Sequence, residues 1–123
     1  MKYLWLLLLF IGTPAAAADD AAVARGKALA EVNCAGCHAI EATGASPLAA
    51  APRFPDIAVS FDLADLEDSL NEGVAADHTI MPDWQMTSEQ AHALASYIIS
   101  LAPAGKLKSE AAPGAQPDLA AAP

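Results

Sequence analysis

The chain is poor in basic residues and in cysteine. Its 123 residues include six Lys and Arg against fifteen Asp and Glu, a formal net charge of −9 at pH 7. An acidic surface repels phosphate groups, which makes nucleic acids and anionic membrane surfaces poor partners. Only two cysteines are present, and there is no second C-x-x-C pair. Since a structural zinc ion needs four ligands, a cysteine-rich zinc site is also excluded.

Long apolar runs are missing as well. The one apolar run, Leu4 to Gly12, follows a positive Lys2 and precedes four alanines at 15–18. It is short for a transmembrane helix, so we expect no stable membrane insertion, and an uncleaved anchor is the alternative. The pattern predicts a cleaved secretory signal peptide over residues 1–18, and hence export. Residues 103–123 are rich in Pro and Ala without apolar periodicity, which predicts a disordered tail after a domain spanning 19–102.

No alternating strand pattern and no internal repeat occur, and the apolar spacing predicts an all-α domain with three or more helices. The expected helices are 20–33, 62–72 and 88–101.

Local signals mark the ends of these helices. Asp19 and Asp20 suit the positive N-terminal end of the first helix. Gly73 is a C-terminal stop for the second, and Thr87 with Gln90 predicts a capping box for the third. The segments between the helices are long for loops, as expected if they wrap a cofactor.

Cys34-Ala35-Gly36-Cys37-His38 is the motif that carries chemistry. The spacing C-x-x-C-H is the attachment site of a c-type haem, in which two thioethers fix the macrocycle and the histidine ligates the iron. A thioredoxin-like site would need a βαβ pattern, which is missing here. A simple disulfide between Cys34 and Cys37 is the remaining alternative. A small domain of this kind would fold poorly without a haem in its core.

A second axial ligand of the iron is expected from a methionine or histidine. Met81 precedes Pro82, which fixes its own φ angle and restricts Met81 to an extended conformation, so we predict that Met81 is the ligand. His78, in the same segment, is the competitor. Met86 is predicted to pack as a staple or a wall of the haem pocket, and His92 to face solvent.

With these features in order, the chain resembles the class I c-type cytochromes, in particular the small monohaem cytochromes that bacteria export to the periplasm. The resemblance covers about residues 21–101. It rests on the Cys34–His38 motif, on Gly26 in the first helix, on Leu94 and Tyr97 in the last helix, and on Met81-Pro82. In this family the last helix crosses the first at the glycine, which implies the same crossing here.

The resemblance also implies a proline whose carbonyl accepts a hydrogen bond from the axial histidine, which would fix its tautomer. Ala51-Pro52-Arg53-Phe54 is similar to the family's Gly-Pro-x-Leu segment and makes Pro52 the first choice. The glycine is replaced, and Pro47 is an alternative. Trp84 is expected to line the haem pocket.

The function implied is that of a periplasmic one-electron carrier with one covalent haem c, axial ligands His38 and Met81, and no enzymatic activity of its own. Its acidity favours a redox partner with a basic docking patch, although it would also serve solubility. Three alternatives stay open. One is a haem subunit or dedicated redox partner of a periplasmic dehydrogenase or terminal oxidase. Another is a gas-binding or peroxidase-like haem protein, which requires that Met81 does not ligate. The third is an exported binding module without haem, in which the two cysteines form a simple disulfide.

Overall fold

The structure, a computed structural model, describes residues 15–73, 80–82 and 84–103, with residues 15–18 described by their backbone alone. It contains the helices α1 (Ala15–Asn33), α2 (Phe54–Ser60), α3 (Leu63–Glu72) and α4 (Ser88–Ser100). No β-strand occurs within this part of the chain, so the all-α prediction is confirmed. The predicted signal peptide lies mainly, and the predicted tail almost entirely, outside the described residues.

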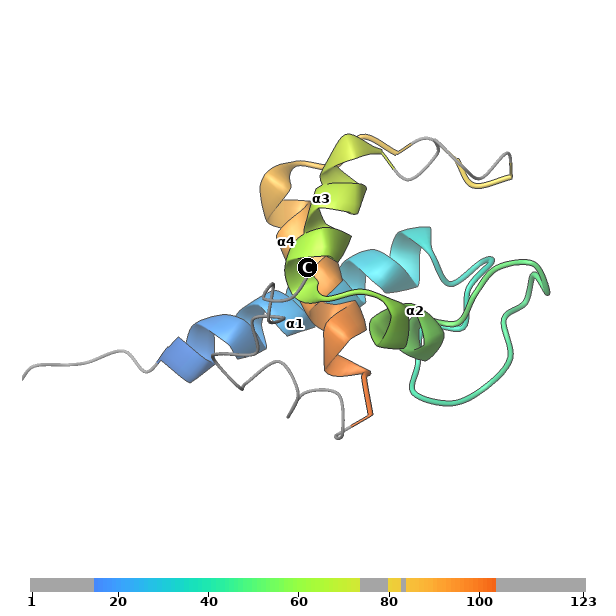
Figure 1. The fold of residues 1–123 in the computed structure, drawn as a ribbon, viewed down its shortest axis with the longest axis horizontal. Helices are drawn as coiled ribbons and strands as arrows, with labels where there is room; N and C mark the ends of the chain where they lie inside the picture. The colour runs from blue at the N-terminus through green and yellow to red at the C-terminus, as the bar shows by residue number, and fades with distance from the viewer. Residues whose placement is uncertain (1–14, 74–79, 83, 104–123) are drawn as a thin grey trace, which may run out of the picture.

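The first and last helices cross at close range. In Figure 1, α1 runs from blue to cyan across α4, which is orange. A Cβ atom added at Gly26 would lie 1.9 Å from the carbonyl oxygen of Ala93 and 2.7 Å from the Cβ of Tyr97. No side chain fits at this point, so the expected crossing at Gly26 is confirmed. Ala22 and Ala30 flank it, one turn away on either side, and are both buried.

The start of α1 differs from the prediction. The helix begins at Ala15, inside the stretch assigned to the signal peptide, and its first turn contains no acidic residue. Asp19 and Asp20 lie beyond the first turn of a helix counted from Ala15, but that turn lies within residues that the predicted cleavage would remove, so their role at the N-terminal end of the mature chain stays a prediction. The alanine run at 15–18 has the highest helix propensity, and it extends the helix past the acidic pair.

The ends of α3 and α4 are set by the residues that mark them in the sequence. The Thr87 hydroxyl accepts a hydrogen bond from the Gln90 amide at 3.2 Å, and the Gln90 side chain accepts one from the Thr87 amide at 3.0 Å. This reciprocal pair is the predicted capping box. Gly73 ends α3 with a φ of 94°, a conformation that favours glycine. Asp62 caps its start, since its carboxylate accepts from the Asp65 amide at 2.9 Å.

Helix α2 is the element that the sequence pattern missed. It has only seven residues, and no side chain caps its start at Arg53. Its formation depends on tertiary burial, because Phe54 is 2% exposed and Ala58 is fully buried. Proline in the first turn of a helix is compatible with this, since the missing amide hydrogen has no intrahelical partner there.

All four helices contribute to one core, in which α1, α2 and α3 each pack against α4. Leu94 is its largest fully buried side chain. The other members, all at most 9% exposed, are Ala30, Cys34, Ile40, Phe54, Ala58, Leu66, Leu70, Ala91, Ala95, Tyr97, Ile98 and Ala102. Trp84 and Met86 are partly buried and pack against this cluster. The Cys34 side chain is thus part of the core, and the cysteine motif lies at the core's edge. No helix among the described residues is both long and apolar enough to cross a bilayer.

Candidate cofactor site

The Cys34–His38 motif forms a single turn that continues from the end of α1. The Cys34 amide still donates to the Ala30 carbonyl at 2.9 Å, as in a helix. The Cys34 carbonyl then accepts from the Cys37 amide at 3.1 Å and from the His38 amide at 2.9 Å. These bonds bring both thiols and the imidazole to one end of α1.

The two cysteines have different surroundings. Both are free thiols; Cys34 is 8% exposed, whereas Cys37 is exposed. Burial, with a smaller contribution from the neighbouring Cys37, raises the pKa of the Cys34 thiol to about 11. As a free thiol in this fold, Cys34 therefore stays protonated at neutral pH. Its thiolate, the nucleophilic form of cysteine, is disfavoured there.

The imidazole of His38 is anchored through one nitrogen. Its Nδ1–H donates to the carbonyl oxygen of Pro52 at 2.6 Å, since a carbonyl can only accept. The tautomer is thereby fixed with the proton on Nδ1, and the lone pair of Nε2 is left for a ligand. The ring of Phe54 lies against the imidazole, with 5.7 Å between ring centroids and an angle of 49°. Of the two prolines considered, Pro52 is the one in contact with His38.

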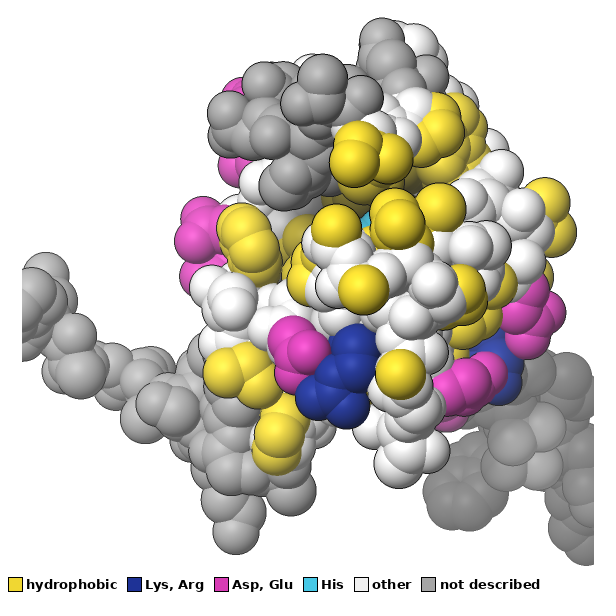
Figure 2. All heavy atoms as spheres, turned by 90° about the vertical axis from the view of Figure 1, so that its right-hand side faces the viewer, with side chains coloured by type: hydrophobic (Ala, Val, Ile, Leu, Met, Phe, Trp, Pro, Cys, Tyr) yellow, Lys and Arg dark blue, Asp and Glu magenta, His cyan; other side chains and the backbone are white. Residues whose placement is uncertain are grey.

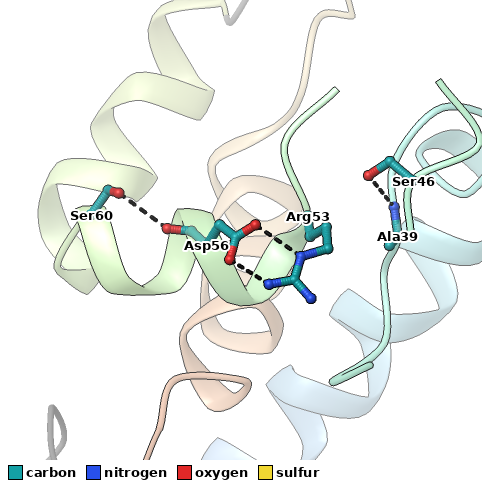
Figure 3. A network of polar contacts seen from close by, with 5 residues as sticks. All are labelled: Ala39, Ser46, Arg53, Asp56 and Ser60. Carbon is teal, nitrogen blue, oxygen red and sulfur yellow. Dashed lines mark hydrogen bonds and ion pairs between the residues drawn. The ribbon is translucent and has the colours of Figure 1, made fainter. Parts of the chain in front are cut away.

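Backbone and hydroxyl bonds fold the segment between His38 and Pro52 back onto the motif. The Ala39 amide donates to the Ser46 hydroxyl at 3.0 Å (Figure 3). The Leu48 amide donates to the Cys37 carbonyl at 3.1 Å, and the Phe54 amide donates to the Ala39 carbonyl at 3.0 Å. The last bond holds the Pro52–Phe54 segment beside His38.

An ion pair follows Pro52 immediately. The Arg53 guanidinium donates to both carboxylate oxygens of Asp56, at 2.9 and 2.7 Å (Figure 3). Mainly through these hydrogen bonds, Arg53 lowers the pKa of the Asp56 carboxyl. The Ser60 hydroxyl donates to the Asp56 carbonyl at 3.0 Å. These contacts strengthen the short helix α2 at the point where it meets the histidine segment.

The predicted sixth ligand lies in the segment between α3 and α4. Met81 is partly buried, and the residue before it, Ile80, is 72% exposed. No described hydrogen bond or ring contact joins Met81 to His38. Its competitor His78 lies outside the described residues. His92 is exposed, as expected, but it is not free: its Nδ1–H donates to Glu67 at 3.0 Å and links α4 to α3.

The lysine and arginine side chains in the described part of the chain are all paired with acidic ones. The three described Lys and Arg side chains, Arg25, Lys27 and Arg53, each form an ion pair with a carboxylate. In contrast, five carboxylates lie between residues 62 and 72, on and beside α3. Figure 2 shows the molecule from the right-hand side of Figure 1. Hydrophobic side chains gather over this face, a small area of histidine surface shows between them, and basic side chains lie next to acidic ones.

The donors present fit a haem. Two thiols lie on one turn, an oriented imidazole nitrogen is available next to them, and a methionine thioether is offered by another segment; nitrogen and sulfur are the axial donors that haem iron takes in cytochromes c. Within the described ranges, no three His, Cys, Asp or Glu side chains cluster as a site for a bare metal ion.

An all-helical core, a glycine crossing of its first and last helices, and a cysteine–histidine turn at its edge define a c-type cytochrome domain. The chain belongs to the family described as cytochrome c oxidase, cbb3-type, subunit III, whose family model matches residues 21–98. The match runs from α1 into α4 and includes the motif, Pro52 and Met81. The family assignment gives the chain a covalently bound c-type haem with its iron, and the role of a haem electron carrier. Comparisons with curated proteins and with solved structures find no match.

The hydroxyl of Tyr97 forms a hydrogen bond that the sequence pattern does not predict. It is buried and donates to the Ile40 carbonyl at 2.8 Å, across 57 residues of sequence. No local pattern could have indicated it.

Proposed function

We propose that the chain is a periplasmic one-electron carrier in which Cys34 and Cys37 hold the haem and His38 and Met81 ligate its iron. The observation that supports this most is the His38–Pro52 hydrogen bond of 2.6 Å, next to two thiols on the same turn. A fixed tautomer leaves the Nε2 lone pair ready to bind a metal, which a histidine that only faces solvent does not require. When bound, the haem supplies the one-electron chemistry between ferrous and ferric iron.

The chain's own residues orient and tune this group. Pro52 orients the imidazole and, by accepting a hydrogen bond from its Nδ1–H, makes Nε2 a stronger donor. Met81 supplies a thioether, which favours the ferrous state relative to a second histidine. If His38 and Met81 both ligate the iron, they would occupy the positions at which a substrate could bind it. The chain is thus a carrier and not an enzyme.

Replacement of the two methionines tests this ligation. In the oxidised holoprotein, Met81→Ala should abolish the weak far-red absorption band of a sulfur–iron bond and lower the reduction potential. Met86→Ala is the matched control, because Met86 packs against the core, and it should leave the band in place. If Met86→Ala abolishes the band instead, the ligand is Met86. A band missing from the wild type would transfer the role to a histidine such as His78.

The covalent link has a direct test of its own. Acid–acetone extraction should leave the haem with the polypeptide, and replacement of both Cys34 and Cys37 should yield little folded protein. Colour that passes into the organic layer would contradict thioether attachment.

The charge distribution points to a partner with a basic docking patch. Because Arg25, Lys27 and Arg53 are each paired, the carboxylates of α3 are not offset by nearby Lys or Arg in the described part of the chain. Attraction between this helix and a positive patch would accelerate encounter and would be screened by salt. Asp83, beside Trp84 in the sequence, lies outside the described residues.

A second candidate function is that of a haem subunit or dedicated partner of a terminal oxidase, and the description of the matching family favours it over a dehydrogenase partner. Purification at low ionic strength from the native cell distinguishes the two. A free carrier should elute alone, whereas a subunit should elute with a larger enzyme.

Export is the remaining part of the proposal and rests on the pattern of residues 1–18. Mass spectrometry of the natively expressed protein should find a chain that begins at residue 19. An intact Met1 would contradict cleavage.

A further inference from the structure

The buried hydroxyl of Tyr97 points to a link between the helix crossing and the axial histidine. Tyr97 is 4% exposed, and its Cβ is one of the atoms that exclude a side chain at Gly26. Its position is therefore fixed by the packing of α4 on α1. From there its O–H reaches the carbonyl of Ile40, two residues after His38, at 2.8 Å.

Further contacts connect the segment that contains Ile40 to the imidazole. The carbonyl of the preceding residue, Ala39, accepts from the Phe54 amide at 3.0 Å, which holds the segment that carries Pro52. The Phe54 ring contacts both other rings, with its centroid 5.7 Å from that of His38 and 6.4 Å from that of Tyr97. The Pro52 carbonyl then accepts from His38.

We propose that Tyr97 is a positioning residue for His38, an inference that rests on the proposed ligation by that histidine. Its hydroxyl holds residues 39 and 40 in place, so that the Phe54 and Pro52 contacts keep the imidazole in a single orientation. Loss of the hydroxyl leaves the buried Ile40 carbonyl without its donor, and a buried acceptor without a partner destabilises the local conformation. The segment then opens more often, and the His38–Pro52 hydrogen bond opens with it.

The neighbouring ion pair offers an internal contrast. Glu41 follows Ile40 and pairs with Lys27 of α1 at 3.1 Å, but both side chains are about half exposed. Exposed ion pairs contribute little. Of these two contacts with the helices, the buried hydroxyl therefore contributes more to the position of the segment than the ion pair does.

The test is Tyr97→Phe in the holoprotein, which keeps the ring and removes only the hydroxyl. We expect the His38 Nδ1 proton of the ferrous protein to exchange with solvent about tenfold faster, equivalent to about 1.4 kcal/mol. The reduction potential should rise, because a weaker bond to Pro52 makes the imidazole a weaker donor. Ser100→Ala is the matched control: it removes a hydroxyl that donates to the Tyr97 carbonyl at 2.6 Å on the same helix, and both readouts should stay at wild-type values.

A lower melting temperature for Tyr97→Phe with an unchanged exchange rate and potential would overturn the proposal, since Tyr97 would then be structural only. Equal acceleration in Ser100→Ala would overturn it as well. If Tyr97→Phe fails to fold, hydrogen exchange in the wild-type protein tests the proposal. The Phe54 amide and the His38 ring proton should have equal protection within about threefold if one opening exposes both, and clearly different protection would refute the link. A wild type without haem-shifted His38 signals would instead refute the proposed ligation itself.

Discussion

Gly26→Ala is the substitution whose effect follows most directly from the structure. The added methyl would lie 1.9 Å from the Ala93 oxygen, whereas real Cβ atoms stay at least 3.0 Å from such a neighbour. The obstacle is backbone and cannot rotate away, so α4 must withdraw from α1 by about 1 Å. Overpacking of this kind costs about 1–3 kcal/mol, and the fixed obstacle places this case at the upper end. Alanine returns about 1 kcal/mol of helix propensity, which leaves a net loss of about 2 kcal/mol.

A loss of that size is large for a small domain. At about 4–8 °C per kcal/mol, the melting temperature should fall by about 8–16 °C. Circular dichroism of the holoprotein during heating measures this. Gly36→Ala is the matched control, because a Cβ there meets no atom within 4 Å, and it should melt near the wild-type temperature. A Gly26→Ala protein that melts at or above the wild-type temperature would refute the close crossing.

Four further predictions concern the caps, the charges and the tail. Thr87→Ala should lose about 1 kcal/mol in thermal unfolding, because it removes half of the capping box, and Thr87→Ser should retain most of it. Asp56 has a lowered pKa, so its contribution to stability is present at neutral pH and is lost as the pH falls through that lowered pKa. Asp56→Asn should therefore be less stable than the wild type at pH 7 and equally stable in acid. Denaturant titrations at each pH measure the two free energies of unfolding. Asp68→Asn on α3 should flatten the fall of the bimolecular electron-transfer rate with ionic strength, whereas Asp19→Asn on α1 should not; equal slopes would mean that α3 does not face the partner. A chain truncated after Ala104 should keep its spectrum and melting temperature, and a clear loss of stability would show that the tail packs on the domain.

The sequence predicts well those elements whose ends are coded by neighbouring residues. The helix expected over 88–101 is observed over Ser88–Ser100, and that expected over 62–72 is observed over Leu63–Glu72. Capping boxes and glycine stops act within a few residues, so a single sequence contains the whole signal. The crossing at Gly26 could be predicted for a related reason. A glycine inside a helix costs stability, which implies that another element packs closely against it.

What the sequence does not predict depends on contacts between distant residues. Helix α2 lacks a side-chain cap and is stabilised by burial of Phe54 and Ala58 in a core that three other helices build. The Tyr97–Ile40 bond and the His92–Glu67 pair join residues that are 57 and 25 positions apart. Helical periodicity tells which face of α4 is apolar, but it cannot tell which carbonyl a buried hydroxyl will meet.

The packing of α1 on α4 also has a consequence for the order of events during synthesis. The chain is made from its N-terminus, so α1 and the cysteine motif exist well before Ser88–Ser100, the helix that packs on α1, has been added. Until then the crossing at Gly26 has no partner, and nothing buries the thiol of Cys34. We therefore expect both cysteines to be open to attachment enzymes while the chain is incomplete. Once α4 has packed on α1, the Cys34 side chain is buried in the core.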